Sequence, residues 1–150
     1  MSNSSTLMSL VQRFADAECC WMSTVRPNGR SHSSPIWHVW HEGRAYVVTK
    51  GTAVKTHNIT LNPSVVITHP DPKDVVIIEG MARLAPEKRA ALRPLLLQKY
   101  KWDISDPDEA NYNTVIEITP TRLIAWGAYG EGRWTGAKVT AVREVASNAD

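Results

Sequence analysis

The sequence predicts a mainly β fold with a few helices: one small antiparallel barrel, closed or nearly closed, of six or seven strands. Short runs rich in β-branched and aromatic residues recur along the chain, and hairpin turn signals separate several of them. The regular alternation of strands and helices that builds a doubly wound parallel sheet is missing, as is a Gly-x-Gly-x-x-Gly fingerprint. These observations favour a barrel over a doubly wound sheet.

The first third of the chain is expected to form one helix and three strands. Apolar residues at helical spacing from Leu7 to Phe14 predict an amphipathic helix over residues 4–17. Asn28-Gly29 accepts positive φ and therefore predicts a hairpin turn, and Gly43 predicts a second turn within residues 41–44. The strands expected around these turns cover residues 19–25, 30–40 and 45–49.

The later strands are less regular because glycine and proline interrupt them. Gly80 predicts a bulge or bend inside its strand. Pro94 is expected to kink or split the helix that Pro86 opens, and Pro120 to separate two strands. The strands expected here cover residues 65–68, 75–84, 112–119 and 121–126. We expect one domain over residues 1–138, followed by a flexible C-terminal tail over residues 139–150.

Composition and charge narrow the function classes. No apolar stretch approaches the ~20 residues of a membrane span. The 17 basic and 15 acidic residues give a formal net charge of +2, which does not indicate a nucleic-acid partner. No signal peptide is visible, and the adjacent Cys19 and Cys20 make a poor disulfide, so a cytoplasmic protein with reduced thiols is expected. His38 and His41 would face opposite sides of a strand, and no metal site is expected.

The segment from Ala45 to Pro63 carries the most specific functional signal. A β-rich run leads through Lys50-Gly51 into a helix that Thr52 would cap. The first turn of a helix presents free backbone N–H groups at the positive end of the helix dipole, an arrangement that binds anions such as phosphate. Lys50 and Lys55 bracket this position. The same residues are also compatible with ordinary capping and solvation.

Several motifs follow one another in a specific order between Cys19 and Trp134. They are a strand pair over residues 21–37, a Lys55-x-x-Asn58-Ile59-x-x-Asn62-Pro63 helix, the strand Ile78-Glu79-Gly80-Met81-Ala82 and a closing Arg122-Leu123-Ile124-Ala125-Trp126. This order resembles the FMN-binding split-barrel family, which includes pyridoxamine 5′-phosphate oxidase and general-stress-type flavin proteins. The resemblance implies a six- to seven-stranded antiparallel split barrel and a homodimer with its FMN site at the subunit interface. F420 is the alternative cofactor.

The resemblance also implies which residues hold the cofactor. The flavin phosphate would lie at the strand-to-helix turn, against Thr49, Lys50, Val54 and Lys55. The isoalloxazine ring would lie along the second strand, and residues near the C-terminus would reach it from the other subunit. The residues implied for these two roles are Ser33, Ser34, Pro35, Ile36 and Trp37 on the strand, and Trp126 and Arg133 from the other subunit.

Pro35 interrupts the second strand and admits two interpretations. A proline removes a donor from the strand ladder, so it belongs at an edge, a bulge or a break. If a flavin lies here, the interrupted ladder leaves backbone groups of Ser34 and Ile36 free to bond its polar edge. The other interpretation is an ordinary edge strand.

Flavin chemistry requires no catalytic acid or base from the protein, and the sequence identifies none. We expect an FMN-dependent oxidoreductase that transfers hydride or electrons between the flavin and a small molecule. Val54-Lys55 replaces the Arg-Lys pair of the oxidase, and residues 127–133 lack its substrate-binding stretch, so a substrate other than pyridoxamine phosphate is expected. The alternatives are an F420-dependent reductase of the same fold and a non-enzymatic flavin- or haem-binding protein.

Overall fold

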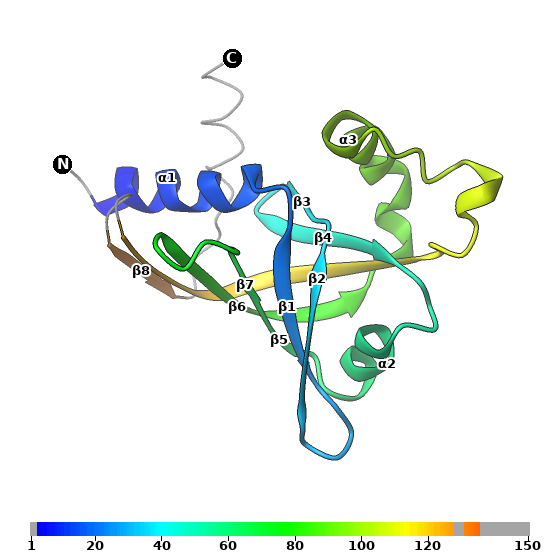
Figure 1. Cartoon of the computed structure of the whole chain (residues 1–150), viewed down its shortest axis with the longest axis horizontal. Coiled ribbons are helices and arrows are strands. Elements are labelled where there is room, and N and C mark those ends of the chain that lie inside the picture. The colour runs from blue at the N-terminus through cyan, green and yellow to red at the C-terminus, as the bar shows by residue number, and fades with distance from the viewer. Residues whose placement is uncertain (1–2, 128–130, 136–150) are drawn as a thin grey trace.

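The computed structural model describes residues 3–127 and 131–135, which form one curved antiparallel sheet flanked by helices (Figure 1). Within these residues the sheet has eight strands. In spatial order they are β2 (Ser31–Ile36), β1 (Cys20–Val25), β5 (Ser64–Thr68), β6 (Val75–Leu84), β7 (Thr114–Trp126), β4 (Arg44–Thr49) and β3 (Val39–His41), with β8 (Gly132–Thr135) paired to β7 off this path. The predicted mainly β barrel is confirmed, as a half-barrel whose end strands β2 and β3 do not pair within the described residues.

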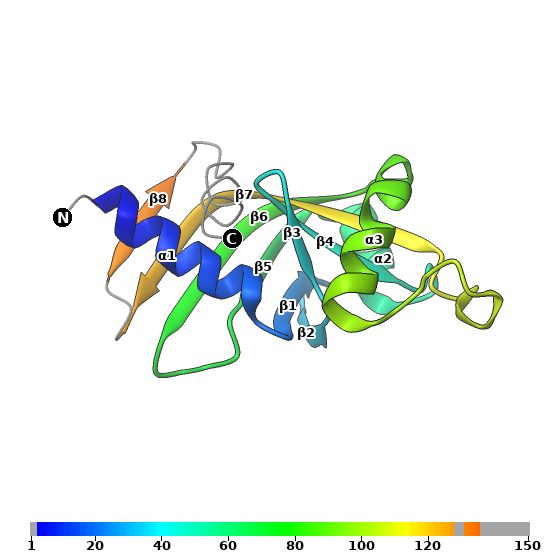
Figure 2. The same cartoon turned by 90° about the horizontal axis from the view of Figure 1, so that it is seen from above.

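Helices cover the two ends of the sheet. The described helical elements are α1 (Asn3–Asp16), α2 (Val54–Leu61), α3 (Arg89–Tyr100) and the 3-10 turns η1 (Pro86–Lys88) and η2 (Pro107–Glu109). α1 lies along the β8 end, whereas α2 and α3 lie toward the opposite end (Figures 1 and 2). None of the helices in the described part of the chain is long and apolar enough to span a membrane.

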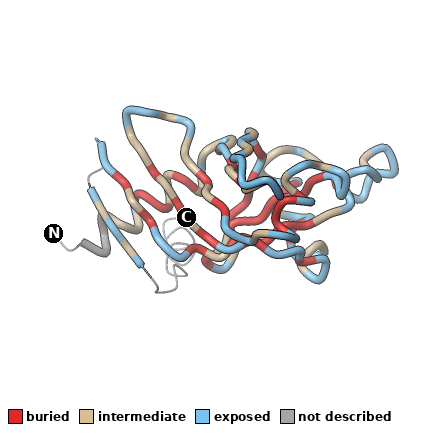
Figure 3. Tube along the Cα trace, turned by 90° about the horizontal axis from the view of Figure 1, so that it is seen from below, coloured by how far each residue is buried: buried red, intermediate tan, exposed pale blue. Residues whose placement is uncertain are grey.

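The concave interior of the sheet holds the main hydrophobic core. Alternate strand residues such as Met22, Ile67 and Ile118 are fully buried there, together with Phe14 of α1. Figure 3 shows buried positions running through the middle of the sheet. A second cluster covers the outer face of β4 and β7, where α3 packs; it contains Val39, Tyr46, Val48, Ala85, Leu92, Leu96, Ile104 and Val115. This second cluster fixes α3 beside β4.

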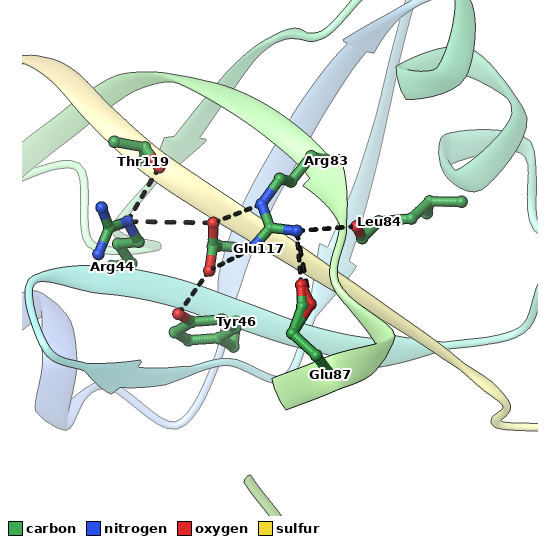
Figure 4. Close-up of polar contacts among 7 residues, drawn as sticks. All are labelled: Arg44, Tyr46, Arg83, Leu84, Glu87, Glu117 and Thr119. Atoms are coloured by element: carbon green, nitrogen blue, oxygen red, sulfur yellow. Dashed lines mark hydrogen bonds and ion pairs between the residues drawn. The ribbon is translucent and has the colours of Figure 1, made fainter. Parts of the chain in front are cut away.

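A buried carboxylate interrupts the apolar pattern of β7. Only 5% of Glu117 is exposed, and its carboxylate accepts hydrogen bonds from Tyr46 Oη at 2.7 Å and from Arg83 Nε at 2.9 Å (Figure 4). Arg44 Nε lies 4.0 Å from Glu117 Oε1. Burial by itself would raise the pKa of Glu117, but the hydrogen bonds from Tyr46 and Arg83 and the two arginine charges hold it below its ordinary value. The residue therefore stays ionised inside the fold at neutral pH.

Gly80 and Pro120 lie opposite each other in the β6–β7 pair. The register shifts between Glu79 and Gly80, which confirms the predicted bulge. A Cβ at residue 80 would lie 2.7 Å from the carbonyl oxygen of Thr119, so the close approach of the strands requires glycine. The expectation that Pro120 separates two strands is wrong, because β7 runs through it without a break. The missing N–H of Pro120 falls where the bulge already interrupts the ladder.

The single strand expected over residues 30–40 is also wrong, because β2 ends at Ile36 and β3 begins at Val39. α3 holds the intervening backbone in place of a strand partner. Tyr100 Oη lies 2.9 Å from both the amide nitrogen and the carbonyl oxygen of His38, and Lys99 Nζ donates to the same carbonyl at 2.7 Å. The turn into β4 is confirmed, with Glu42 and Gly43 at positive φ.

Two further expectations are corrected, and one lies outside the described residues. Pro94 does not split its helix, because α3 continues from Arg89 to Tyr100; the carbonyl left unpaired belongs to exposed Ala90, where water can bind it. β8 was not expected, since four residues that begin with glycine carry almost no strand pattern. The predicted tail at residues 139–150 falls outside the described part of the chain.

Candidate functional site

A cavity of about 370 Å³ opens beside β2 and β4, near the seam where the half-barrel does not close. Its volume lies in the range of small-molecule sites. Segments far apart in the sequence contribute to it: the end of β2, the end of β4, the start of α2 and the loop before β7. The lining residues are Pro35, Ile36, Trp37, Val47, Val48, Thr49, Lys55, Trp102, Glu109 and Tyr112.

Five of the residues that the sequence singled out line this one cavity. Pro35, Ile36 and Trp37 come from the β2 end, and Thr49 and Lys55 come from the strand-to-helix segment. The fold therefore brings together the two segments assigned to the flavin ring and to its phosphate.

The side chains of β2 alternate between the two faces of the sheet. Ser34 and Ile36 point to the same side as the buried Met22 and Cys20, and Ser34 Oγ is buried without a hydrogen-bond partner among the described residues. Ser33 lies on the other face, where its Oγ is 2.7 Å from Ser23 Oγ. Among the described strands β2 pairs only with β1, so Pro35 does lie on an edge strand, and it also lines the cavity.

The start of α2 differs in one detail from the expectation. Ala53, not Thr52, is the N-cap residue, and no side chain caps this end. The reason is the preceding turn, in which the Ala53 N–H donates to the Lys50 carbonyl at 3.1 Å. Thr56 Oγ1 donates to the same carbonyl at 2.8 Å, and the Gly51 N–H donates to Asn113 Oδ1 at 2.9 Å. Hydrogen bonds with α2 and with Asn113 therefore fix the turn, while the first N–H groups of α2 lack a side-chain cap.

The two lysines occupy different positions. Lys55 is half-buried in the cavity wall, and burial lowers the pKa of its ammonium. Lys50 is exposed, and its Nζ lies 5.4 Å from the ring centre of Tyr112. Lys55 therefore presents a positive charge directly to the cavity, and Lys50 stands at its rim.

Three lining residues were missed because they lie in and after a polar loop without periodicity. Trp102, Glu109 and Tyr112 line the cavity, but the sequence assigned none of them to a site. Trp37 stacks on Tyr100 with ring centres 4.4 Å apart, and Trp102 stands nearly perpendicular to both Trp37 (79°) and Tyr112 (88°). The only signal in the sequence was two aromatic residues and several acids close together in that loop.

Trp126 and Arg133 do not reach this cavity within one chain. They line a second cavity of about 470 Å³, together with residues of α1, β7, β8 and the residue before β8: Leu7, Ile124, Ala125, Gly132 and Glu131. The two cavities share no lining residue. These two predicted residues are therefore positioned by a different part of the sheet.

The ionisable side chains that line the first cavity in the described part of the chain are Lys55, Glu109 and Tyr112. His38 is fully buried, its Nε2 lies 2.9 Å from the carbonyl oxygen of Phe14, and burial lowers its pKa to about 3. Over residues 3–127 and 131–135, no group of three or more His, Cys, Asp or Glu side chains is arranged to hold a metal ion. The cavity instead offers apolar walls, one lysine and one glutamate.

Solved structures with a similar fold include proteins of several kinds. An F420 reductase shares 21% identity (TM-score 0.61) over 75% of this chain and 94% of its own. General Stress Protein 26 from Bacillus anthracis str. Sterne shares 22% sequence identity (TM-score 0.62), and the match covers 79% of this chain and 92% of that protein. A heme binding protein from Mycobacterium smegmatis shares 17% sequence identity (TM-score 0.69), and the match covers 90% of this chain and 58% of that protein. At these identities the likeness concerns the fold alone.

Comparison of the sequence with known proteins identifies the family of the chain. No curated protein matches the chain significantly. The family model described as pyridoxamine 5′-phosphate oxidase, however, matches residues 9–127, a range that runs from α1 to the end of β7 and includes every residue of the first cavity. Together with the half-barrel and its cavity, this match means that the chain belongs to the pyridoxamine 5′-phosphate oxidase family.

Proposed function

We propose that the chain binds FMN in the cavity between β2 and β4 and works as a flavin-dependent oxidoreductase on a small molecule. The observation that carries this proposal is the meeting of the 33–37 and 49–55 segments around one cavity with a half-buried lysine. Lys55, Lys50 and the uncapped first turn of α2 suit a phosphate. Residues Pro35 to Trp37 offer an apolar wall on a strand whose outer edge has no strand partner among the described residues, which suits the flavin ring.

The residues of the chain would bind and orient rather than react. Bound flavin supplies hydride and electron transfer by its own chemistry. Lys55 would hold the phosphate, and the apolar lining residues Ile36, Val47 and Val48 would help to exclude water from the cavity. Val54, half-exposed beside Lys55, would complete the rim. The free thiols of Cys19 and Cys20 suit the reducing cytoplasm in which we expect the protein to work.

A row of side chains on the outer face of the sheet supports a homodimer. Cross-strand pairing links Pro35, Trp21, Thr68, Ile77, Ile124 and Arg133, one residue from each of six strands. Trp21 is 46% exposed, and Trp126 on the same face is 47% exposed. Two such faces related by a twofold axis, with their rows antiparallel, would bring the Arg133 end of one subunit to the Pro35 end of the other. Trp126 and Arg133 would then complete the cofactor site of the partner subunit.

The dimer has a direct test. Light scattering at micromolar concentration should give about twice the chain mass of 16.7 kDa. Trp21→Arg should shift the protein to the monomer, because a charge in the middle of an apolar interface loses its hydration. Leu97→Arg is the control, since Leu97 is equally exposed (47%) but lies on α3. A wild-type monomer that binds FMN, or equal effects of the two variants, would refute the interface.

The redox proposal predicts that bound FMN exchanges electrons with small molecules. We expect NADH or NADPH to bleach the flavin absorbance of the FMN-loaded protein under anaerobic conditions, and the photoreduced protein to reduce a quinone, a nitro compound or oxygen. The control is free FMN at the same concentration. If no donor bleaches the bound flavin and no acceptor reoxidises it, the enzyme proposal fails and a binding or storage role replaces it.

Two other cofactors are the alternatives, because similar structures include an F420 reductase and a heme binding protein. The same samples separate them by absorbance. Haem gives a Soret band, F420 gives a deazaflavin spectrum, and FMN gives the two bands of a flavin. The neighbourhood of Lys55 suits the phosphate of FMN, and no described histidine lines the cavity as an axial ligand for haem.

A further inference from the structure

We propose that the part of the first cavity formed by Trp37, Trp102, Tyr112 and Glu109 binds a positively charged organic group, such as the quaternary ammonium of a substrate. We call these four residues the aromatic corner. The inference rests on the proposed function, because it names the substrate class for the same cavity. It concerns the side of the cavity formed by Trp37 and by the loop before β7.

The three rings form a corner rather than a flat stack. Trp102 lies 5.8 Å from Trp37 at 79° and 5.1 Å from Tyr112 at 88°, measured between ring centres. All three residues line the same cavity. Perpendicular walls of this kind offer π-faces from more than one direction, which is the arrangement that recognises quaternary ammonium groups.

The cavity lining carries one charge of each sign among the described residues. Glu109 is the acidic residue of the lining and Lys55 the basic one. Glu109 is partly buried, and its side chain makes no ion pair or hydrogen bond with another described residue. A carboxylate beside π-faces attracts a cation and repels an anion. An anionic group beside Lys55 and a cationic group beside Glu109 are therefore the complementary ligands.

Tyr112 already interacts with a cation. Lys50 Nζ lies 5.4 Å from its ring centre, within the distance of a cation–π contact. Lys50 approaches from the rim, whereas Trp102 packs against Tyr112 edge to face. When a phosphate is bound at the α2 end, it offsets the charges of Lys50 and Lys55, so the cavity becomes more favourable for a second, cationic ligand.

Rigid support makes the corner suitable for binding. Trp37 stacks on Tyr100 with ring planes parallel, and Tyr100 Oη lies 2.9 Å from both backbone polar groups of His38. Trp102 and Tyr112 pack against the second hydrophobic cluster. A ligand that enters the corner would lose little affinity to the ordering of its walls.

The test compares choline with its neutral isostere 3,3-dimethylbutan-1-ol by calorimetric titration of FMN-loaded protein. The two molecules have nearly the same shape, so a difference in affinity reports the charge. We expect choline to bind about tenfold or more tightly than the alcohol. Glu109→Gln should weaken choline binding about three- to tenfold and leave the affinity of the alcohol unchanged. Trp102→Leu should weaken the binding of choline further.

Asp108→Asn is the matched control, because it removes one negative charge from the neighbouring, exposed residue of η2. It should not change choline affinity. Equal affinities for choline and the alcohol, or equal effects of the Glu109 and Asp108 variants, would overturn the inference.

The two proposals fail separately. The same titrations are run on protein without flavin, and FMN binding is measured independently by fluorescence. Binding of FMN without preference for choline overturns only the aromatic corner. Preference for choline in protein that does not bind FMN supports the corner and overturns the proposed function.

Discussion

Tyr46→Phe is expected to lower the free energy of unfolding by about 2 kcal/mol, because it removes a hydrogen bond to a buried, ionised carboxylate. Tyr46 Oη donates to Glu117 Oε2 at 2.7 Å, and both residues are buried. The ring and its packing stay in place in the variant. Urea unfolding at neutral pH is the measurement, and for a chain of this size the midpoint of thermal unfolding should fall by roughly 4 to 8 °C.

Tyr112→Phe is the control for this change. It removes the same group from a tyrosine whose hydroxyl makes no hydrogen bond with another described residue. We expect its unfolding free energy to stay within about 0.5 kcal/mol of wild type. Equal losses in the two variants would show that the contact between Tyr46 and Glu117 does not stabilise the fold.

The effect of Tyr46→Phe should depend on pH. The pKa of Glu117 in the folded protein lies below its ordinary value of 4.5. A carboxyl whose pKa is lowered by folding adds stability above its unfolded pKa and loses it as the pH falls through the folded one. The difference between wild type and Tyr46→Phe should therefore be constant at neutral pH and shrink below about pH 4.5.

Lys55→Ala is expected to weaken FMN binding about ten- to a hundredfold, which corresponds to the ~1.5–3 kcal/mol of a charge-assisted contact with phosphate. Lys55 lines the cavity and is half-buried, so its charge is screened less than that of a surface lysine. Lys88→Ala is the control, because Lys88 lies in the 3-10 turn before α3 and does not line the cavity. Flavin fluorescence titration measures both variants against wild type.

Local signals predicted a large part of the fold. The turn before β4 follows from Glu42 and Gly43, and the bulge in β6 follows from Gly80, because each depends on a backbone conformation or a close approach that few residues permit. The amphipathic spacing of Leu7 to Phe14 likewise predicted α1. In each case the residue type and the local conformation are directly connected.

The predicted strand boundaries were wrong where residues far away in the sequence determine the local structure. β2 breaks at Trp37 because Lys99 and Tyr100, more than sixty residues later in the chain, bind the backbone of His38. Pro120 stays within its strand because Gly80 lies opposite. Neither contact can be read from the local sequence.

The residues of the candidate site also fall into two groups: those with a local sequence pattern and those that only tertiary packing brings to the cavity. The strand-to-helix turn with Lys50 and Lys55 has a local pattern, and so does Pro35 inside a strand. Trp102, Glu109 and Tyr112 come from a loop, and tertiary packing alone brings them to the cavity. Glu109 in particular has no sequence context that separates it from the exposed acids beside it.

The most direct test of the account is to titrate wild type and Lys55→Ala with FMN and with riboflavin, which lacks the phosphate. We expect wild type to bind FMN at least tenfold more tightly than riboflavin, and this preference to fall to a small remainder in Lys55→Ala while riboflavin affinity hardly changes. Equal affinity of wild type for the two flavins, or a preference for FMN that survives the loss of Lys55, would contradict the placement of a flavin phosphate at the start of α2.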